Sequence, residues 1–213
     1  TYDEAPYPLL VERGGSDPAL ETAARRDIET FGLLAGQDCD AYVARLAALL
    51  GQDCRPVAAN LPRWKAEAPF SFESLTAAYR ANGAGQFARW RAFVWENGTL
   101  IPVADPDLGA EGEMVGYEAQ REEVVANTRA LLSGQAVNNV LLYGDSGTGK
   151  SATVKHLLAV PGLEDLRMVE ADKENLGDLP VLIRLLAGRR QKFILFIDDL
   201  AFDRDDRTYS VLK

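Results

Sequence analysis

The feature that most constrains the fold is an apolar tetrapeptide that runs directly into a glycine-rich loop. Residues 140–143 are continuously apolar, which is typical of a strand buried on both faces. Residues 144–151 follow and match the pattern G-x-x-x-x-G-K-[ST]. Beyond them we expect a helix through residue 158. A strand, a glycine loop and a helix in this order predict a phosphate-binding P-loop.

The residue types of this loop suit a nucleoside triphosphate, and we expect ATP with Mg²⁺. Glycines allow backbone N–H groups to approach phosphate oxygens closely, and the start of a helix adds partial positive charge. Lys150 is expected to reach the β- and γ-phosphates and to act in catalysis, and the Ser151 hydroxyl is expected to bind Mg²⁺. The residues expected to contact the nucleotide here are Gly144, Asp145, Ser146, Gly147, Thr148, Gly149, Lys150, Ser151 and Ala152.

A second motif supports the first. Residues 193–197 read as a buried strand that ends in Asp198 and Asp199. Two adjacent carboxylates at the end of an apolar strand are costly to desolvate unless a cation compensates them. We therefore expect Asp198 to hold Mg²⁺ and Asp199 to orient or deprotonate the attacking water. A solvated strand end is the alternative when this motif is taken by itself.

A weaker signal precedes the predicted P-loop strand. Val115, Gly116 and Tyr117 stand before a helix predicted over residues 117–133. They could contact an adenine ring through backbone and apolar atoms, or they could be an ordinary helix start.

The remaining patterns predict an α/β fold preceded by a smaller helical domain. Strands over 167–171 and 193–197 alternate with helices over 117–133 and 179–187, which indicates a parallel sheet flanked by helices. Asp17 and Ser71 read as helix caps, and Gly51 as a helix stop. An apolar stripe over 87–94 reads as a further helix. The expected divisions are a helical domain over 1–96, a linker over 97–114 and a nucleotide-binding domain over 115–213.

The three tryptophans allow two interpretations. Trp64, Trp90 and Trp95 could stack on nucleic-acid bases, or they could fill the core of the helical domain. The second interpretation is favoured because Phe87, Trp90 and Phe93 fall on one helical face. The formal net charge of −9 disfavours non-specific binding to nucleic acid.

Composition also bears on the cellular setting. Cys39 and Cys54 are too few for a metal site, and we expect two free thiols. No apolar run reaches the roughly 20 residues that span a bilayer. We expect a cytoplasmic protein with no membrane segment.

Residues 115–213 resemble the AAA+ superfamily of P-loop ATPases, through Val115-Gly116, the P-loop and Ile197-Asp198-Asp199. More narrowly, residues 115–122, 138–145 and 192–200 are similar to a bacterial family of unknown function whose members are described as ATP-binding proteins. The resemblance implies ATP hydrolysis that drives conformational change or assembly, a homo-oligomer, and a protein partner bound through the N-terminal domain.

The chain departs from the AAA+ pattern in three respects. Asp199 stands where many members have glutamate, and initiator-type members share the Asp-Asp form, which keeps a helicase-loader role open. Residues 172–175 lack an aromatic pore loop. The strand order implied by the resemblance also needs further strands after residue 199, so we expect a sheet that is incomplete at the C-terminus of a truncated chain. A nucleotide-dependent switch with little or no hydrolysis is the other alternative.

Overall fold

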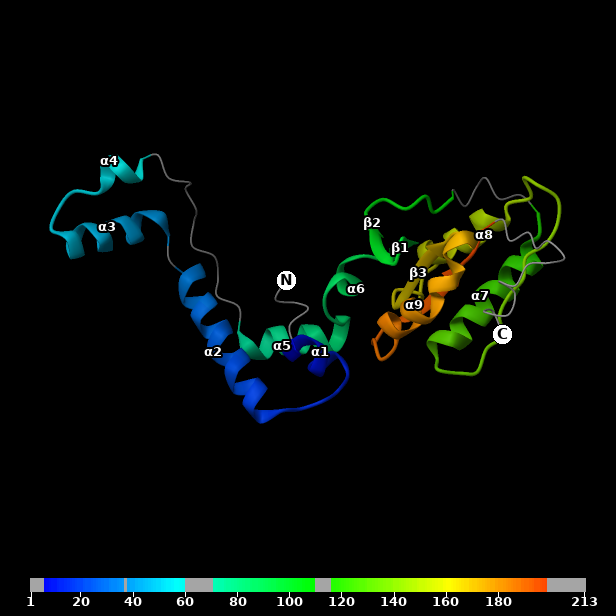
Figure 1. Ribbon diagram of the computed structural model, residues 1–213, viewed down its shortest axis with the longest axis horizontal. Coiled ribbons are helices and arrows are strands. Elements are labelled where there is room, and N and C mark those ends of the chain that lie inside the picture. The colour runs from blue at the N-terminus through cyan, green and yellow to red at the C-terminus, as the bar shows by residue number, and fades with distance from the viewer. Residues whose placement is uncertain (1–5, 37, 60–70, 110–115, 199–213) are drawn as a thin grey trace. The chain divides into compact units, whose positions relative to one another are not determined.

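The chain divides into a helical unit and an α/β unit, both shown in Figure 1. The computed structural model describes residues 6–36, 38–59, 71–109 and 116–198. Thr1–Asn82 forms the first unit and Gly83–Lys213 the second. Across the described ranges, every helix is too short or too polar to span a bilayer. The α/β unit begins at Gly83 and not at residue 115, so it includes residues that we expected in the helical domain and in the linker.

Two helices of the first unit begin where the predicted capping residues stand. Asp17 Oδ1 accepts hydrogen bonds from the N–H groups of Ala19 and Leu20 at 2.9 and 3.1 Å. Ser71 Oγ likewise accepts from the Ser74 N–H at 3.0 Å. These contacts confirm both predicted caps. The helices are α1 (Pro6–Glu12), α2 (Pro18–Ala35), α3 (Cys39–Leu50), α4 (Arg55–Ala58) and α5 (Phe72–Asn82).

A small aromatic cluster holds α1, α2 and α5 together. The rings of Tyr7 and Phe72 lie 5.2 Å apart, and the Tyr7 hydroxyl is 2.8 Å from Thr76 Oγ1. The Arg25 guanidinium lies 4.2 Å from the Phe72 ring centre and forms an ion pair with Glu73 at 2.6 Å. Both Tyr7 and Phe72 are buried, so this cluster is the core of the helical unit.

The second unit is built on a four-stranded mixed sheet in the order β2-β1-β3-β4. The β1–β3 and β3–β4 pairs are parallel, whereas β1 and β2 are antiparallel. The prediction of a purely parallel sheet is therefore wrong. The elements are α6 (Gln86–Arg89), β1 (Ala92–Glu96), β2 (Thr99–Val103), α7 (Glu118–Leu132), α8 (Lys150–His156), η2 (Leu157–Ala159), β3 (Leu166–Ala171), η3 (Lys173–Asp178), α9 (Leu179–Leu186) and β4 (Lys192–Phe196).

The antiparallel pair is a tight hairpin that the sequence analysis missed. Asn97 and Gly98 adopt φ values of 50° and 72° and form its two-residue turn. The helix expected over 87–94 is therefore wrong beyond Arg89, and the expected linker contains β2. Pro102 opposes Phe93, a pair that does not exchange hydrogen bonds in this register, so its nitrogen faces away from β1. A proline in that position protects a sheet edge from adding another strand.

Side chains alternate along the strands and supply a core on each face of the sheet. Trp95 and Val169 contact α9 on one face, whereas Met168 and Phe196 contact α7 and η2 on the other. Trp90 packs beside the first core. Trp90 and Trp95 therefore belong to the core of the α/β unit and not, as predicted, to the core of the helical domain. Trp64 lies outside the described residues.

The strand predicted over residues 140–143 is absent from the structure. Val140, Leu141 and Tyr143 are 50, 74 and 89% exposed, and no described strand pairs with them. A strand needs a neighbour for its backbone groups. Within the described residues β4 pairs only with β3, and no described strand is hydrogen-bonded to residues 140–143.

Two arginines, Arg91 and Arg167, donate hydrogen bonds to backbone carbonyl groups around the sheet. Arg167 donates to the carbonyl oxygens of Phe87, Glu164 and Leu166 at 2.6–2.9 Å. Its side chain is buried, and burial lowers the pKa of Arg167 to about 10. Arg91 donates to two further carbonyl oxygens at 2.6 and 2.7 Å. Each arginine therefore offsets part of its desolvation by donating hydrogen bonds to backbone carbonyl groups.

Replacing Arg167 should destabilise the α/β unit. Arg167→Met keeps the apolar stem but removes all three donors, and we expect it to lower the free energy of unfolding by about 2–3 kcal/mol. The exposed Arg184 is a matched control, since Arg184→Met should change stability by less than about 0.5 kcal/mol. Urea unfolding followed by tryptophan fluorescence measures both. Equal effects in the two variants would contradict the assigned role of Arg167.

The hairpin should be required for the α/β unit to fold. A fragment of residues 83–213 keeps all four strands, and we expect a cooperative thermal transition by circular dichroism. A fragment of residues 115–213 lacks β1 and β2 and leaves one edge of β3 unpaired, so it should melt without cooperativity. Equal cooperative transitions would place the boundary at residue 115 instead.

Candidate functional site

The glycine-rich loop contains two glycines in the left-handed region of backbone conformation. Gly147 and Gly149 have φ values of 78° and 79°, which side chains other than glycine strongly disfavour. No atom lies within 4 Å of a Cβ built on either residue. The left-handed backbone and not a lack of space therefore favours glycine at both positions, and Gly149 is the N-cap of α8. Because α8 has only seven residues, its dipole adds little.

Polar side chains of the loop contact the loop's own carbonyl groups. Lys150 Nζ donates to the carbonyl oxygens of Gly144 and Asp145 at 3.0 and 2.7 Å. Thr148 Oγ1 donates to the Asp145 oxygen at 2.9 Å. The Lys150 ammonium is therefore held against the backbone of the loop that precedes it. Asp145 and Ser146 are exposed on the same loop.

The central contact joins the loop helix to the end of β4. Ser151 Oγ donates to Asp198 Oδ1 at 2.8 Å, although 47 residues separate the two. The sequence analysis assigned these two side chains to the same metal ion. The structure brings both together, at the edge where β4 ends and α8 begins. A hydroxyl and a carboxylate are oxygen donors of the kind that Mg²⁺ prefers.

The other predicted contacts are placed less directly. Ala152 lies beside Gly109, where a built Cβ would be 3.5 Å from the Ala152 Cβ. Ala152 therefore packs against the segment that follows β2. Val115 and Asp199 lie outside the described residues.

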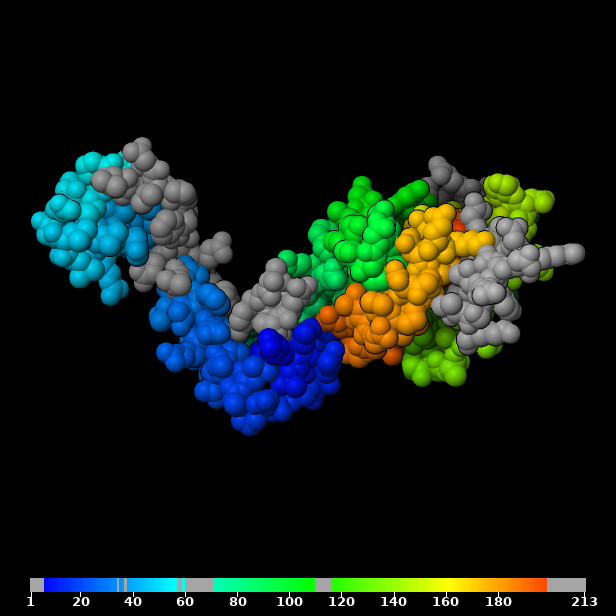
Figure 2. Space-filling model, in the orientation of Figure 1, coloured from blue at the N-terminus to red at the C-terminus, as the bar shows by residue number. Residues whose placement is uncertain are grey.

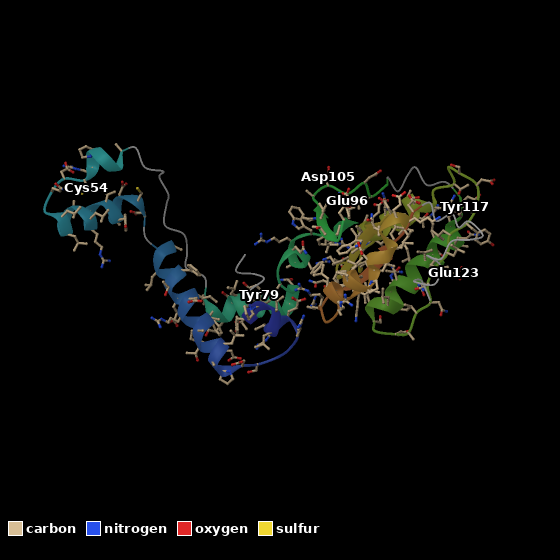
Figure 3. All side chains as sticks on the ribbon, viewed as in Figure 1. Cys54, Tyr79, Glu96, Asp105, Tyr117 and Glu123 are labelled. Carbon is tan, nitrogen blue, oxygen red and sulfur yellow. The ribbon has the colours of Figure 1, made fainter. Side chains whose placement is uncertain are left out.

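The expected adenine-contact segment lies at the start of α7. Gly116 and Tyr117 both have positive φ values, and the Gly116 carbonyl accepts a hydrogen bond from Arg121. Tyr117 is 58% exposed, and Figure 3 places it at the first turn of α7, with Glu123 farther along the helix. The Tyr117 ring is thus available to a ligand from solution.

The site is an open surface. Among the described residues, no three His, Cys, Asp or Glu side chains cluster as a metal cage. Two hollows lie elsewhere, one of about 720 Å³ beside α3 and one of about 500 Å³ between the β1–β2 hairpin and α9. Figure 2 shows the hairpin and α9 side by side on the second unit. Ser151 and Asp198 supply two oxygens, so a cation held between them would take its remaining oxygens from other groups.

Lys155 was not among the residues predicted for the site. Its ammonium group forms an ion pair with Glu170 on β3, at 3.0 Å. The available signal was spacing, because Lys155 stands four residues after Ser151 and so shares its face of the helix.

The loop conformation should have a measurable cost when a Cβ is added. Gly149→Ala forces alanine into the left-handed region, and we expect it to lower the free energy of unfolding by about 1 kcal/mol. Gly134→Ala is a matched control, since Gly134 has φ 74° and open space around it beyond α7. Urea unfolding should give similar losses for both. No loss for Gly149→Ala alone would show that the loop does not hold this conformation.

Comparison with known proteins identifies a family and no further relative. Residues 88–213 match the family described as "Protein of unknown function (DUF815)". Neither the curated proteins nor the solved structures include a match. The matched region contains all four strands, the glycine loop and Asp198, which agrees with the extent of the α/β unit. Because the match covers more than half of its length, the chain belongs to the family described as Protein of unknown function (DUF815).

Proposed function

We propose that the α/β unit binds ATP with Mg²⁺, and that hydrolysis drives conformational change or assembly of a partner. The observation that carries the proposal is the 2.8 Å contact between Ser151 and Asp198. Two residues that the ATP-binding motifs pair in function lie far apart in sequence and next to one another in space. A chance match to the loop pattern gives no reason for that contact.

Phosphate binding would use groups that already converge on the loop. The space that a Cβ would take at Gly147 and Gly149 is open, and the backbone N–H groups of this loop are the proposed phosphate donors. Lys150 would exchange its two carbonyl contacts for phosphate oxygens, which accept stronger, charge-assisted hydrogen bonds. Ser151 and Asp198 would hold Mg²⁺. When bound, that ion neutralises part of the phosphate charge.

Hydrolysis would depend on Asp199, the residue after Asp198. Its carboxylate is proposed to orient or deprotonate the attacking water. This assignment rests on the sequence motif. The side chain is shorter than the glutamate of many AAA+ members, which is why slow turnover and a switch-like role are distinct outcomes of the experiment below.

The remaining expectations concern nucleotide recognition and partners. Exposure of the Tyr117 ring supports an adenine contact at the start of α7. The helical unit has its own core and is the proposed site of partner binding, and the AAA+ resemblance favours a homo-oligomer in the cytoplasm. The net charge of −9 favours a protein partner over nucleic acid.

Substitutions at Lys150 and Asp199 test the proposal. Lys150→Ala should weaken ATP binding about 10- to 100-fold, the loss expected for a charge-assisted hydrogen bond. Asp199→Asn should leave binding intact and lower turnover by about 100-fold or more. Lys192→Ala, at the exposed start of β4, is the control and should change neither. Calorimetric titration measures binding, and phosphate release measures turnover.

The outcomes separate the alternatives. Saturable binding without turnover in the wild-type chain, also at concentrations that favour oligomers, would support the nucleotide-dependent switch. Wild-type affinity in Lys150→Ala would contradict the role of the loop. No ATP binding by the wild-type chain would contradict the proposal as a whole.

A further inference from the structure

Lys155 connects the loop helix to two strands at once. Its Nζ lies 3.0 and 3.2 Å from the carboxylate oxygens of Glu170 on β3. The same nitrogen lies 5.8 Å from the ring centre of Phe196 on β4, within range of a cation–π interaction. The Lys155 and Glu170 side chains are each about one-third exposed, so water screens this pair less than it screens a surface pair.

The two partners of Lys155 are neighbours in the sheet. Glu170 and Phe196 are register partners in the parallel pairing of β3 and β4. A single ammonium group therefore lies over one cross-strand pair and fixes α8 relative to both strands. Thr153, the other hydroxyl-bearing residue of this turn, donates to Gly149 within α8 and not to the sheet.

The spacing of this contact matches that of Ser151 and Asp198. Ser151 precedes Lys155 by four residues, which is about 6 Å along the same helix face. Asp198 follows Phe196, the last residue of β4, by two residues, which is about 6.6 Å where the chain continues extended beyond the strand. The helix and β4 thus run in opposite directions with matched intervals. Both contacts therefore require the same register of α8 along this part of the chain.

We propose that Lys155 is a positioning residue for the magnesium site, acting through its contacts with Glu170 and Phe196. It fixes the register of α8 on β4 so that the Ser151 hydroxyl meets the Asp198 carboxylate. This inference rests on the proposed function, since it concerns the same pair of metal ligands. It adds that the geometry of the pair is maintained by an ion pair outside the loop motif.

The proposal predicts a selective loss of magnesium dependence. ATP affinity is measured by calorimetry in excess Mg²⁺ and in EDTA, and the ratio of the two dissociation constants reports the coupling of the cation to the protein. Lys155→Met keeps the length of the stem and removes the charge. We expect this variant and Glu170→Gln to lower the ratio about tenfold, the usual scale for groups that orient metal ligands. Affinity in EDTA should stay within about twofold.

Two further variants separate positioning from general stability. Lys155→Arg keeps the charge and the partner, and should restore most of the ratio. Arg190→Met removes another ion pair of the same unit, Arg190 with Asp165 at 2.6 Å, in which the Arg190 side chain is 31% exposed and the Asp165 side chain 54%. It should leave the ratio unchanged. Glu170→Gln also provides a second test should Lys155→Met fail to fold, as checked by thermal melting.

Each contrary result has a distinct meaning. An unchanged ratio in both Lys155→Met and Glu170→Gln, with a normal magnesium dependence in the wild-type chain, would overturn this inference and leave the proposed function standing. An equal loss of affinity with and without Mg²⁺ would also overturn it, because it would indicate general damage to the loop. No ATP binding by the wild-type chain would overturn both.

Discussion

The α/β unit depends on β3, which is hydrogen-bonded on both sides and nearly buried along its whole length. It pairs in parallel with β1 and with β4, and its alternate side chains enter the cores on the two faces of the sheet. Its second residue, Arg167, holds the carbonyl oxygen of Phe87 and so ties α6 to the strand. Removing this strand would leave both cores open and would deprive β1 and β4 of the neighbour that they share.

The candidate site follows from that arrangement. Parallel pairing with β3 brings the end of β4, and with it Asp198, to the edge where α8 begins. The helix is held there by Lys155 over the Glu170–Phe196 pair. The glycine loop leads directly into α8. The loop motif supplies the groups that we propose to bind ATP, and the sheet supplies their relative positions.

Local signals predicted much of this, and non-local pairing limited the rest. The caps at Asp17 and Ser71, the strands β3 and β4, and the pairing of Ser151 with Asp198 all follow from patterns short enough to read in sequence. The Asn97-Gly98 turn was also legible, because this dipeptide between apolar runs is a strong hairpin signal. It was assigned to a linker because proline and glycine residues follow it. The segment 140–143 has the composition of a buried strand, yet whether it becomes one depends on a neighbouring strand that its own residues do not specify.

The most direct test of the account is whether Ser151 and Asp198 hold a divalent cation together with ATP. Mn²⁺ can replace Mg²⁺ and be followed by electron paramagnetic resonance. The account predicts that one Mn²⁺ per chain becomes immobilised when ATP is present, and that Asp198→Asn abolishes this signal while ATP still binds in EDTA. A spectrum that remains that of free Mn²⁺–ATP in the wild-type chain would contradict it.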